Sequence, residues 1–414
     1  MKKALFFALI ILTGSAFALN QVSVQLTRLA SSFSSDINAF QHFQPPVYRE
    51  GYYAFIGSDH GATSLGIFSN INGNMQDIAT DQTHLPGGAG QFVNFGGLDN
   101  QGRQLLSINK HSLAFEGNGR FGQTGLYLYS QGQLALIANE KTPVPNSAGT
   151  FNAFMDPGLM LDKSVGFIAQ NSDNTQGIYL ANPQGLLHKL VNTQTTMPHS
   201  QSQFEQFSHL EFSRVSTAKD TDFAFVGKGA GKEIGVYRDM NGKITLIANE
   251  NTQLPDGGTG FFTGFGDLAY DANTQGVAFI GNGILGQTGL YYNDGKQTVM
   301  LANHETFIPQ GIGHFIAFSH VIATDHLIVF HGDGHNGQKG VYVYTSKNGG
   351  IYKILSTGDT ADGKKIKNVM IANESMTDTN LALLVIFENG KEALYVASLT
   401  LPAIEAIPNL SQNG

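Results

Sequence analysis

The chain has 414 residues and a formal net charge of −8, from 24 basic and 32 acidic residues. An anionic chain without a basic stripe lacks the charge that binds phosphate backbones, which excludes nucleic acid as an expected partner. The chain has no cysteine, which excludes disulfides, thiolate chemistry and cysteine-ligated metals. Its 50 glycines and its low content of charged residues, 14%, are typical of many short strands joined by tight turns.

The first 18 residues have the pattern of a secretory signal. Lys2 and Lys3 precede an apolar run at residues 4–13, and small residues follow up to Ala18. The run is well short of the ~20 residues that span a bilayer, so we expect cleavage after Ala18 rather than an anchor. No later apolar stretch is long enough to insert. We therefore expect an exported protein, periplasmic or secreted, that is soluble and monomeric.

A repeated unit of roughly 55 residues follows the signal. Its first landmark is a small residue, Phe, any residue and Gly, and its second is Gly, an aliphatic residue and an aromatic one. Copies of the second landmark begin 51 to 59 residues apart, which indicates tandem repeats. The first landmark begins at Ala54, Ala114, Ala224 and Ala278, with variants at Gly166 and Val329; the second begins at Gly66, Gly125, Gly177, Gly235, Gly289 and Gly340, with a degenerate copy at Ala393.

Two further landmarks complete the unit. One is Leu-Ile-Ala-Asn followed by Thr and Pro at intervals of three, and it predicts a loop whose side chains satisfy local backbone groups; a binding loop is the alternative. The other is Phe-x-x-Phe. Asn-Gly and Asp-Gly pairs predict tight hairpins, and the segments that they join, such as residues 125–129 and 134–138, are too short for helices. The Phe-x-x-Phe pairs begin at Phe40, Phe92, Phe151, Phe204, Phe262 and Phe315.

The two ends of the repeat region are complementary. Residues 26–30 and the Phe40 pair carry only the third and fourth landmarks, whereas residues 381–387 and 393–396 carry degenerate first and second ones. Two half-units make one unit if the terminal strands pair, which closes a ring. We therefore predict an all-β, seven-bladed β-propeller at residues 19–399, after the signal at 1–18 and before a tail at 400–414. A linear β-solenoid is the alternative, and it would need capping ends.

The repeats resemble those of exported bacterial β-propeller proteins of unknown function. The resemblance rests on the Ala-Phe-x-Gly, Gly-aliphatic-Tyr and Ile-Ala-Asn elements and covers about residues 24–398. It implies the fold and export, and it supplies no catalytic residue. The chain has no Trp, so it lacks both the Trp-Asp repeat and the sialidase-type Asp box of better-known propellers.

Polar residues that break the repeat are the candidate site residues. His331, Asp333 and His335 alternate along one segment, and two imidazoles with a carboxylate suit a divalent metal such as Zn²⁺. The equivalent segments elsewhere are turns, so no cofactor is the main expectation and a metal the alternative. Glu116 and His331 also replace the Ile or Val of the first landmark, which marks both as ligand-binding candidates.

The function therefore has two candidate classes. Gly-x-Ser-x-Gly, His-Glu-x-x-His and phosphate-binding Gly loops are absent from the sequence, so we expect an exported non-catalytic protein that binds a glycan or a protein. The alternative is a hydrolase or lyase that acts on a glycan or small ester at a central-channel site. An enzyme should bring unlike titratable groups together from different blades, whereas a binder should repeat similar pockets.

Overall fold

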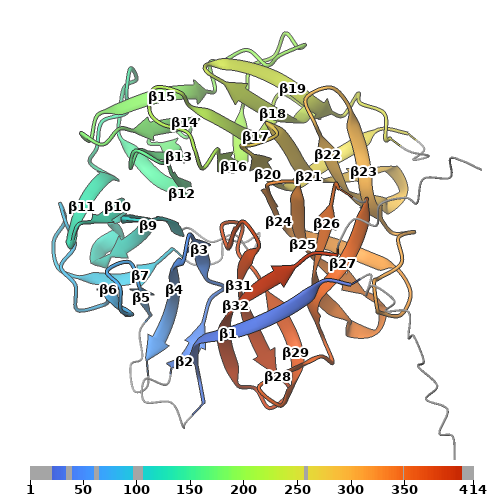
Figure 1. Cartoon of the computed structure of the whole chain (residues 1–414). Helices are drawn as coiled ribbons and strands as arrows, with labels where there is room; N and C mark the ends of the chain where they lie inside the picture. The colour runs from blue at the N-terminus through green and yellow to red at the C-terminus, as the bar shows by residue number, and fades with distance from the viewer. Residues whose placement is uncertain are drawn as a thin grey trace, which may run out of the picture.

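The structure is a computed structural model that describes residues 21–33, 40–59, 65–96, 106–255, 260–347 and 349–402. Seven antiparallel sheets surround a common axis as seven blades (Figure 1). The predicted all-β, seven-bladed propeller is thus confirmed. The predicted signal at residues 1–18 and all but the start of the predicted tail lie outside the described residues. Within the described residues, no helix has the length and hydropathy needed to cross a membrane.

Each blade runs from an inner strand at the axis to an outer strand at the rim. Blade 1 contains β2 (Phe40–Phe43), β4 (Tyr52–Asp59), β5 (Gly66–Ser69) and β6 (Gln76–Ala79), with β3 (Val47–Arg49) beside β4. Blade 2 contains β7 (Phe92–Phe95), β9 (Ser112–Gly119), β10 (Thr124–Ser130) and β11 (Gln133–Asn139), with β8 (Leu106–Asn109) beside β9. Blade 3 contains β12 (Phe151–Leu159), β13 (Val165–Asn171), β14 (Gln176–Ala181) and β15 (Leu187–Asn192).

The remaining blades repeat the order. Blade 4 contains β16 (Gln206–Phe212), β17 (Asp222–Lys228), β18 (Ile234–Met240) and β19 (Lys243–Asn249). Blade 5 contains β20 (Phe262–Asp271), β21 (Gly276–Gly283), β22 (Thr288–Asn293) and β23 (Thr298–Asn303). Blade 6 contains β24 (Phe315–Thr324), β25 (Leu327–Gly334), β26 (Lys339–Thr345) and β27 (Gly350–Ser356). Blade 7 contains β28 (Thr360–Ala361), β29 (Lys364–Met370), β30 (Met376–Thr377), β31 (Asn380–Phe387), β32 (Glu392–Thr400) and β1 (Ser23–Ser31). Three 3-10 turns lie at Arg120–Gly122, Ile284–Gly286 and His335–Gly337.

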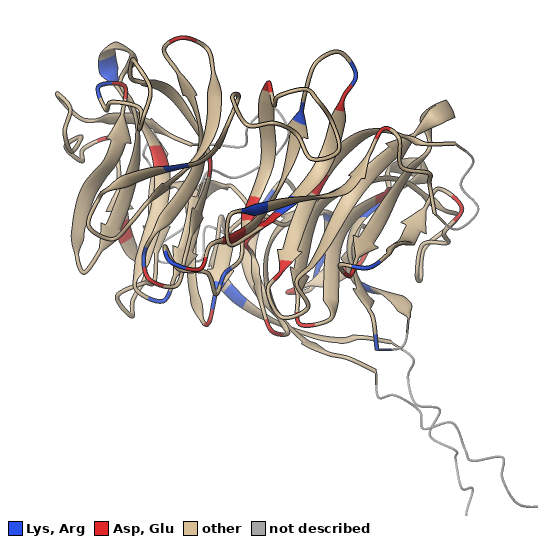
Figure 2. Cartoon of the chain, turned by 90° about the horizontal axis from the view of Figure 1, so that it is seen from above, with Lys and Arg blue, Asp and Glu red and all other residues tan. Residues whose placement is uncertain are grey.

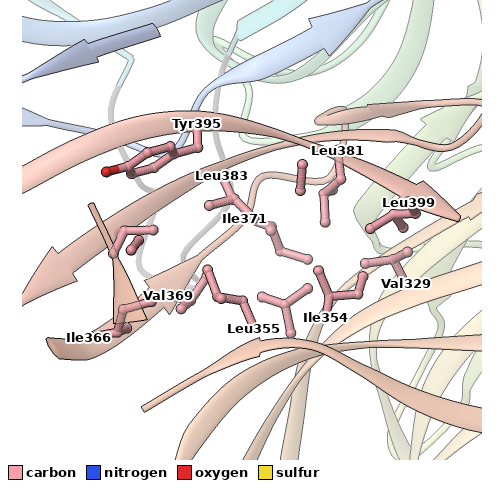
Figure 3. Close-up of a cluster of buried hydrophobic side chains, with 14 of the residues drawn as sticks. Val329, Ile354, Leu355, Ile366, Val369, Ile371, Leu381, Leu383, Tyr395 and Leu399 are labelled. Atoms are coloured by element: carbon pink, nitrogen blue, oxygen red, sulfur yellow. The ribbon is translucent and has the colours of Figure 1, made fainter. Parts of the chain in front are cut away.

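The aromatic landmarks form one cluster in each of blades 1 to 6. In blade 4, Phe204 contacts Tyr237 edge-on at 5.0 Å between ring centroids and Phe225 at 5.6 Å. The glycine of the first landmark is required here, because a Cβ on Gly227 would lie 2.4 Å from the Phe204 ring. Neighbouring blades also pack aliphatic side chains against one another, and Val329 of blade 6 and Leu383 of blade 7 belong to one such cluster (Figure 3).

The Asn and Thr of the third landmark stabilise their own loops. Thr142 Oγ1 accepts a hydrogen bond from the backbone N–H of Asn139 at 2.9 Å and donates to Asn139 Oδ1 at 3.1 Å. The same pair of bonds recurs at Asn192, Asn249 and Asn303. The predicted local role of these side chains is confirmed.

The two terminal strands close the ring. β1 pairs with β32 antiparallel from Ser23 opposite Thr400 to Ser31 opposite Ala393. An ion pair between Arg28 and Asp362, 2.5 Å from Nη1 to Oδ2, adds a contact between the first strand and the last blade. The predicted closure by chain ends is confirmed.

Buried charges connect blades across the axis where the inner strands end. Arg49 of blade 1 donates hydrogen bonds to the carbonyls of Leu159 in blade 3 and of Arg214, in the loop between β16 and β17 of blade 4. Arg214 in turn donates to the carbonyl of Met376 in blade 7. Burial raises the pKa of Glu374, and the nearby guanidinium groups of Arg214 and Arg49 oppose that rise. Since blades 4 and 7 face each other across the ring, these side chains close one end of the axis.

Replacing Glu374 with Leu should lower the free energy of unfolding by about 3 kcal/mol, because it leaves two guanidinium groups without their carboxylate. Urea unfolding of the variant measures this loss. Glu388→Ala, at an exposed turn of the same blade, is the control and should change stability by less than about 0.5 kcal/mol. A loss as small as that for Glu374→Leu would contradict the role of the buried charges.

Candidate functional site

One polar residue occupies the same position on four consecutive inner strands. The second residue after Phe-x-x-Phe is acidic or His in blades 3 to 6, and at this point each inner strand shifts register against its neighbour. Three of the four have positive φ, between 50° and 52°, and such bulges redirect a side chain. The four residues are Asp156, His209, Asp267 and His320.

These residues contact one another across blade boundaries. His209 Nδ1 lies 3.1 Å from Asp267 Oδ1, and both side chains are over nine-tenths buried, with 8% and 6% of their surface exposed. The backbone N–H of His320 donates to Asp267 Oδ2 at 2.8 Å. Likewise, the backbone N–H of Leu210 donates to Asp156 Oδ2 at 3.1 Å. The carboxylates therefore bind the inner strand of the next blade as well as carrying charge to the axis.

A cavity of about 590 Å³ lies over the His209–Asp267 pair, within the range of ~300–1,000 Å³ usual for ligand sites. Its wall combines side chains that form hydrogen bonds with apolar ones such as Phe265, Ile280 and Ile316. The polar members besides the pair are Asn282, Thr288, His304 and Ser319. His209 Nε2 has no hydrogen-bond partner among the described residues. The cavity thus offers a fixed imidazole nitrogen to a ligand.

Exposed apolar side chains lie on the loops next to this cavity. Loops of blades 5 and 6 at the end where the inner strands begin expose large hydrophobic side chains, including Leu285 at 93% and Phe307 at 72%. Leu285 holds this exposed position with a φ of 61°. Elsewhere acidic and basic residues are interspersed around the blades rather than gathered by sign (Figure 2). The surface around the cavity is therefore suited to an uncharged ligand or partner.

Two of the three predicted metal ligands lie close together. His331 Nδ1 is 3.6 Å from Asp333 Oδ1, whereas His335 begins the 3-10 turn that follows the strand. In the part of the chain that the structure describes, no group of three His, Asp or Glu side chains is arranged to hold a metal ion. The metal stays a prediction, and its third ligand is not in place among those residues.

His331 also adjoins the inner-strand residues of blade 6. Its Nδ1 lies 3.4 Å from Ser319 Oγ, which lies 3.1 Å from His320 Nδ1. Ser319 and Asp333 therefore face the same ring nitrogen, so the three do not form a relay for acyl transfer, in which the two nitrogens have separate partners. Burial lowers the pKa of His331 to about 3, and the electrostatic interactions with His320 and Lys339 add to this effect.

Glu116 lies in blade 2, away from the cavity over the His209–Asp267 pair. Burial raises the pKa of its carboxyl to about 7, and hydrogen bonds to Thr124 and Asn118 partly offset the rise. The structure does not bring Glu116 and His331 together, because they occupy the same position in different blades. The inner-strand set from Asp156 to His320 was missed by the sequence analysis, although its fixed distance from Phe-x-x-Phe was a usable signal.

Comparisons with known proteins show the fold and leave the activity open. A family model described as "Family of unknown function (DUF7453)" matches residues 10–284. The β-propeller domain of the Trilobed protease from Pyrococcus furiosus has a TM-score of 0.52 and 11% identity, covering 89% of this chain and 100% of its own. An oligogalacturonate lyase in complex with manganese has a TM-score of 0.52 and 12% identity, covering 92% and 98%. Such identities show the fold alone. No curated protein matches the chain in sequence.

The low pKa of His331 makes the stability of the fold depend on pH. The unfolded chain takes up a proton near pH 6.5 that the folded chain takes up only near pH 3, so this stability is complete above pH 6.5 and is lost as the pH falls toward 3. At pH 5 the loss should be roughly 2 kcal/mol. The free energy of unfolding in urea should therefore be lower at pH 5 than at pH 7.5. His331→Gln should reduce this difference by roughly 2 kcal/mol. An unchanged difference would contradict a buried neutral imidazole.

Proposed function

Since the chain belongs to a family of unknown function, which supplies no activity, we propose from the geometry of the cavity that the protein binds a neutral glycan there. The observation that carries the proposal is the buried His209–Asp267 pair beneath an open cavity. Nδ1 lies 3.1 Å from the carboxylate oxygen Oδ1 of Asp267, so Nε2 is the imidazole nitrogen left to form a hydrogen bond with a ligand hydroxyl. Burying such a pair is costly unless it serves a ligand or the fold.

The rest of the lining supports a hydroxylated, uncharged ligand. Asn282, Thr288 and Ser319 each donate and accept hydrogen bonds, which suits sugar hydroxyls. The apolar wall suits the carbon face of a sugar ring. No Lys or Arg is among the lining residues, so an acidic ligand would meet the Asp267 carboxylate without a compensating cation. As part of this proposal the protein is exported, is a monomer and needs no cofactor.

The same pair favours a second candidate, a hydrolase or lyase acting on a glycan or small ester. An imidazole oriented by a carboxylate is the arrangement of a general base, and unlike titratable groups from three blades lie on this side of the axis. In that case His209 Nε2 would take a proton from water or from the substrate. The described residues offer no nucleophile in contact with Nε2, which is why binding is the leading proposal.

Isothermal titration calorimetry of the protein against neutral oligosaccharides and small esters tests both candidates. A binding glycan should lose affinity by at least about ten-fold in His209→Ala, because one good hydrogen bond to a buried partner is lost. Asp267→Asn should lower affinity too, since it removes the carboxylate that lies 3.1 Å from His209 Nδ1. His188→Ala, at an exposed position of blade 3, is the control.

Product analysis of the same mixtures separates the two candidates. Binding without turnover supports the binding protein, and turnover that disappears in His209→Ala supports the enzyme. No saturable binding to any member of the panel, or binding that His209→Ala leaves unchanged, would contradict the proposed site.

A further inference from the structure

A second cavity, of about 190 Å³, lies between blades 5 and 6 toward the outer rim. It shares no lining residue with the cavity over His209. Its apolar and aromatic walls are Val299, Leu301 and Ile328 with the rings of Tyr292 and Tyr344, and its polar lining is Asp271, Asp294, Gln297, His326 and Ser346. The two blades lie side by side, with β23 of blade 5 beside the later strands of blade 6 (Figure 1). The cavity is thus a gap in the packing between two blades.

The same position between blades 1 and 2 has no such gap. Tyr129 of blade 2 corresponds to Tyr344 of blade 6, because each lies two residues after the Tyr of the second landmark and pairs with β9 or β25 in the same register. The Tyr129 hydroxyl accepts hydrogen bonds from Asn72 Nδ2 at 2.8 Å and Gln76 Nε2 at 3.4 Å. Blade 1 therefore supplies two donors that fill the space around this Tyr, which is only 9% exposed.

Blade 5 lacks both donors. The hairpin between the two outer strands has the same length in both blades. In blade 1 it joins the pair Ser69 and Gln76, and in blade 5 it joins the corresponding pair Tyr292 and Val299. Gly295 then stands at the position of Asn72, and Val299 at that of Gln76. Among the described residues, the Tyr344 hydroxyl has no hydrogen-bond partner. The repeat thus shows which group is missing here, namely a hydrogen-bond donor in the space beside Tyr344.

Acidic groups line the open cavity. Tyr292 and Thr274 hydroxyls lie 2.6 Å apart, and Thr274 donates to Asp271 Oδ2 at 2.8 Å. Asp294 Oδ1 accepts two backbone N–H groups at 2.8 and 2.9 Å, which hold the pKa of its carboxyl low, with a smaller contribution from Lys296 in the same turn. No Lys or Arg lines the cavity. Its walls therefore combine negative charge with aromatic rings.

We propose that this cavity binds a small organic ammonium ion that has an aromatic or branched apolar body. An ammonium group is the donor that Tyr344 lacks, and it is attracted by the faces of aromatic rings and by carboxylates. The apolar body packs against Val299, Leu301 and Ile328. An apolar cavity of about 150 Å³ holds a benzene ring, so about 190 Å³ accommodates a ring with a short amine.

Benzylamine and its uncharged analogue benzyl alcohol test the proposal by isothermal titration calorimetry at low ionic strength. Benzylamine should bind at one site with an affinity at least about ten-fold higher than benzyl alcohol, because only the amine carries the charge. Asp294→Asn keeps an acceptor for the turn and removes the carboxylate. It should therefore lower the affinity for benzylamine several-fold and leave the affinity for benzyl alcohol unchanged. Equal affinities for the two compounds, or no saturable binding of benzylamine, would overturn the proposal.

A matched pair of variants locates the site. Val299→Gln gives blade 5 the glutamine that blade 1 has at position 76. This side chain should fill the cavity and donate a hydrogen bond to the Tyr344 hydroxyl, so benzylamine binding should be lost. Gln76→Val, the reverse change in blade 1, should leave benzylamine binding unchanged, and so should His209→Ala in the separate cavity. An unchanged melting midpoint without ligand shows that Val299→Gln still folds. Full binding by the folded Val299→Gln variant would overturn the assignment to this cavity.

Discussion

The pairing of β1 with β32 is the constraint on which the rest of the structure depends. A single blade buries one set of aromatic rings but leaves both of its faces without neighbours, and only a closed ring gives every blade two. Closure also makes the seven inner strands parallel around one axis. Residues at the same repeat position then lie at the same height, so that a His in blade 4 meets an Asp in blade 5.

Much of the fold could be predicted from the sequence because the landmarks are packing requirements. The glycine of Ala-Phe-x-Gly leaves room for a Phe ring, as at Gly227 beneath Phe204, and such a requirement recurs at a countable spacing. The complementary ends predicted the shared blade because unpaired strands at both ends of the repeats would leave open sheet edges. The strand that completes blade 7 is β1, whereas Phe40 and Phe43 pack on Phe55 in blade 1. The register shifts along the inner strands could not be predicted, because no residue type in Phe-x-x-Phe marks a bulge.

Those shifts explain why the candidate site was missed. Asp156, His209 and His320 have positive φ, which turns their side chains toward neighbouring blades, whereas a regular strand would alternate them predictably. By contrast, Glu116 and His331 were predicted as site residues because they are polar at a position that is apolar in other repeats. Burial raises the pKa of Glu116 and lowers that of His331. Such a shift reports the local surroundings of a side chain. It does not report which other residues share its cavity, and that depends on the arrangement of the blades.

The cross-axis contacts of Arg49 and Arg214 bear on how molecules enter and leave. A propeller open at both ends would let solvent and solutes pass along its axis. Here the side chains that join blades 1, 3, 4 and 7 lie across the axis at the end where the inner strands finish, so the route to the cavity over His209 is from the opposite end. A ligand at the proposed site would then enter and leave by the same end of the ring. A partner bound to the exposed loops of Leu285 and Phe307 would therefore block that exchange.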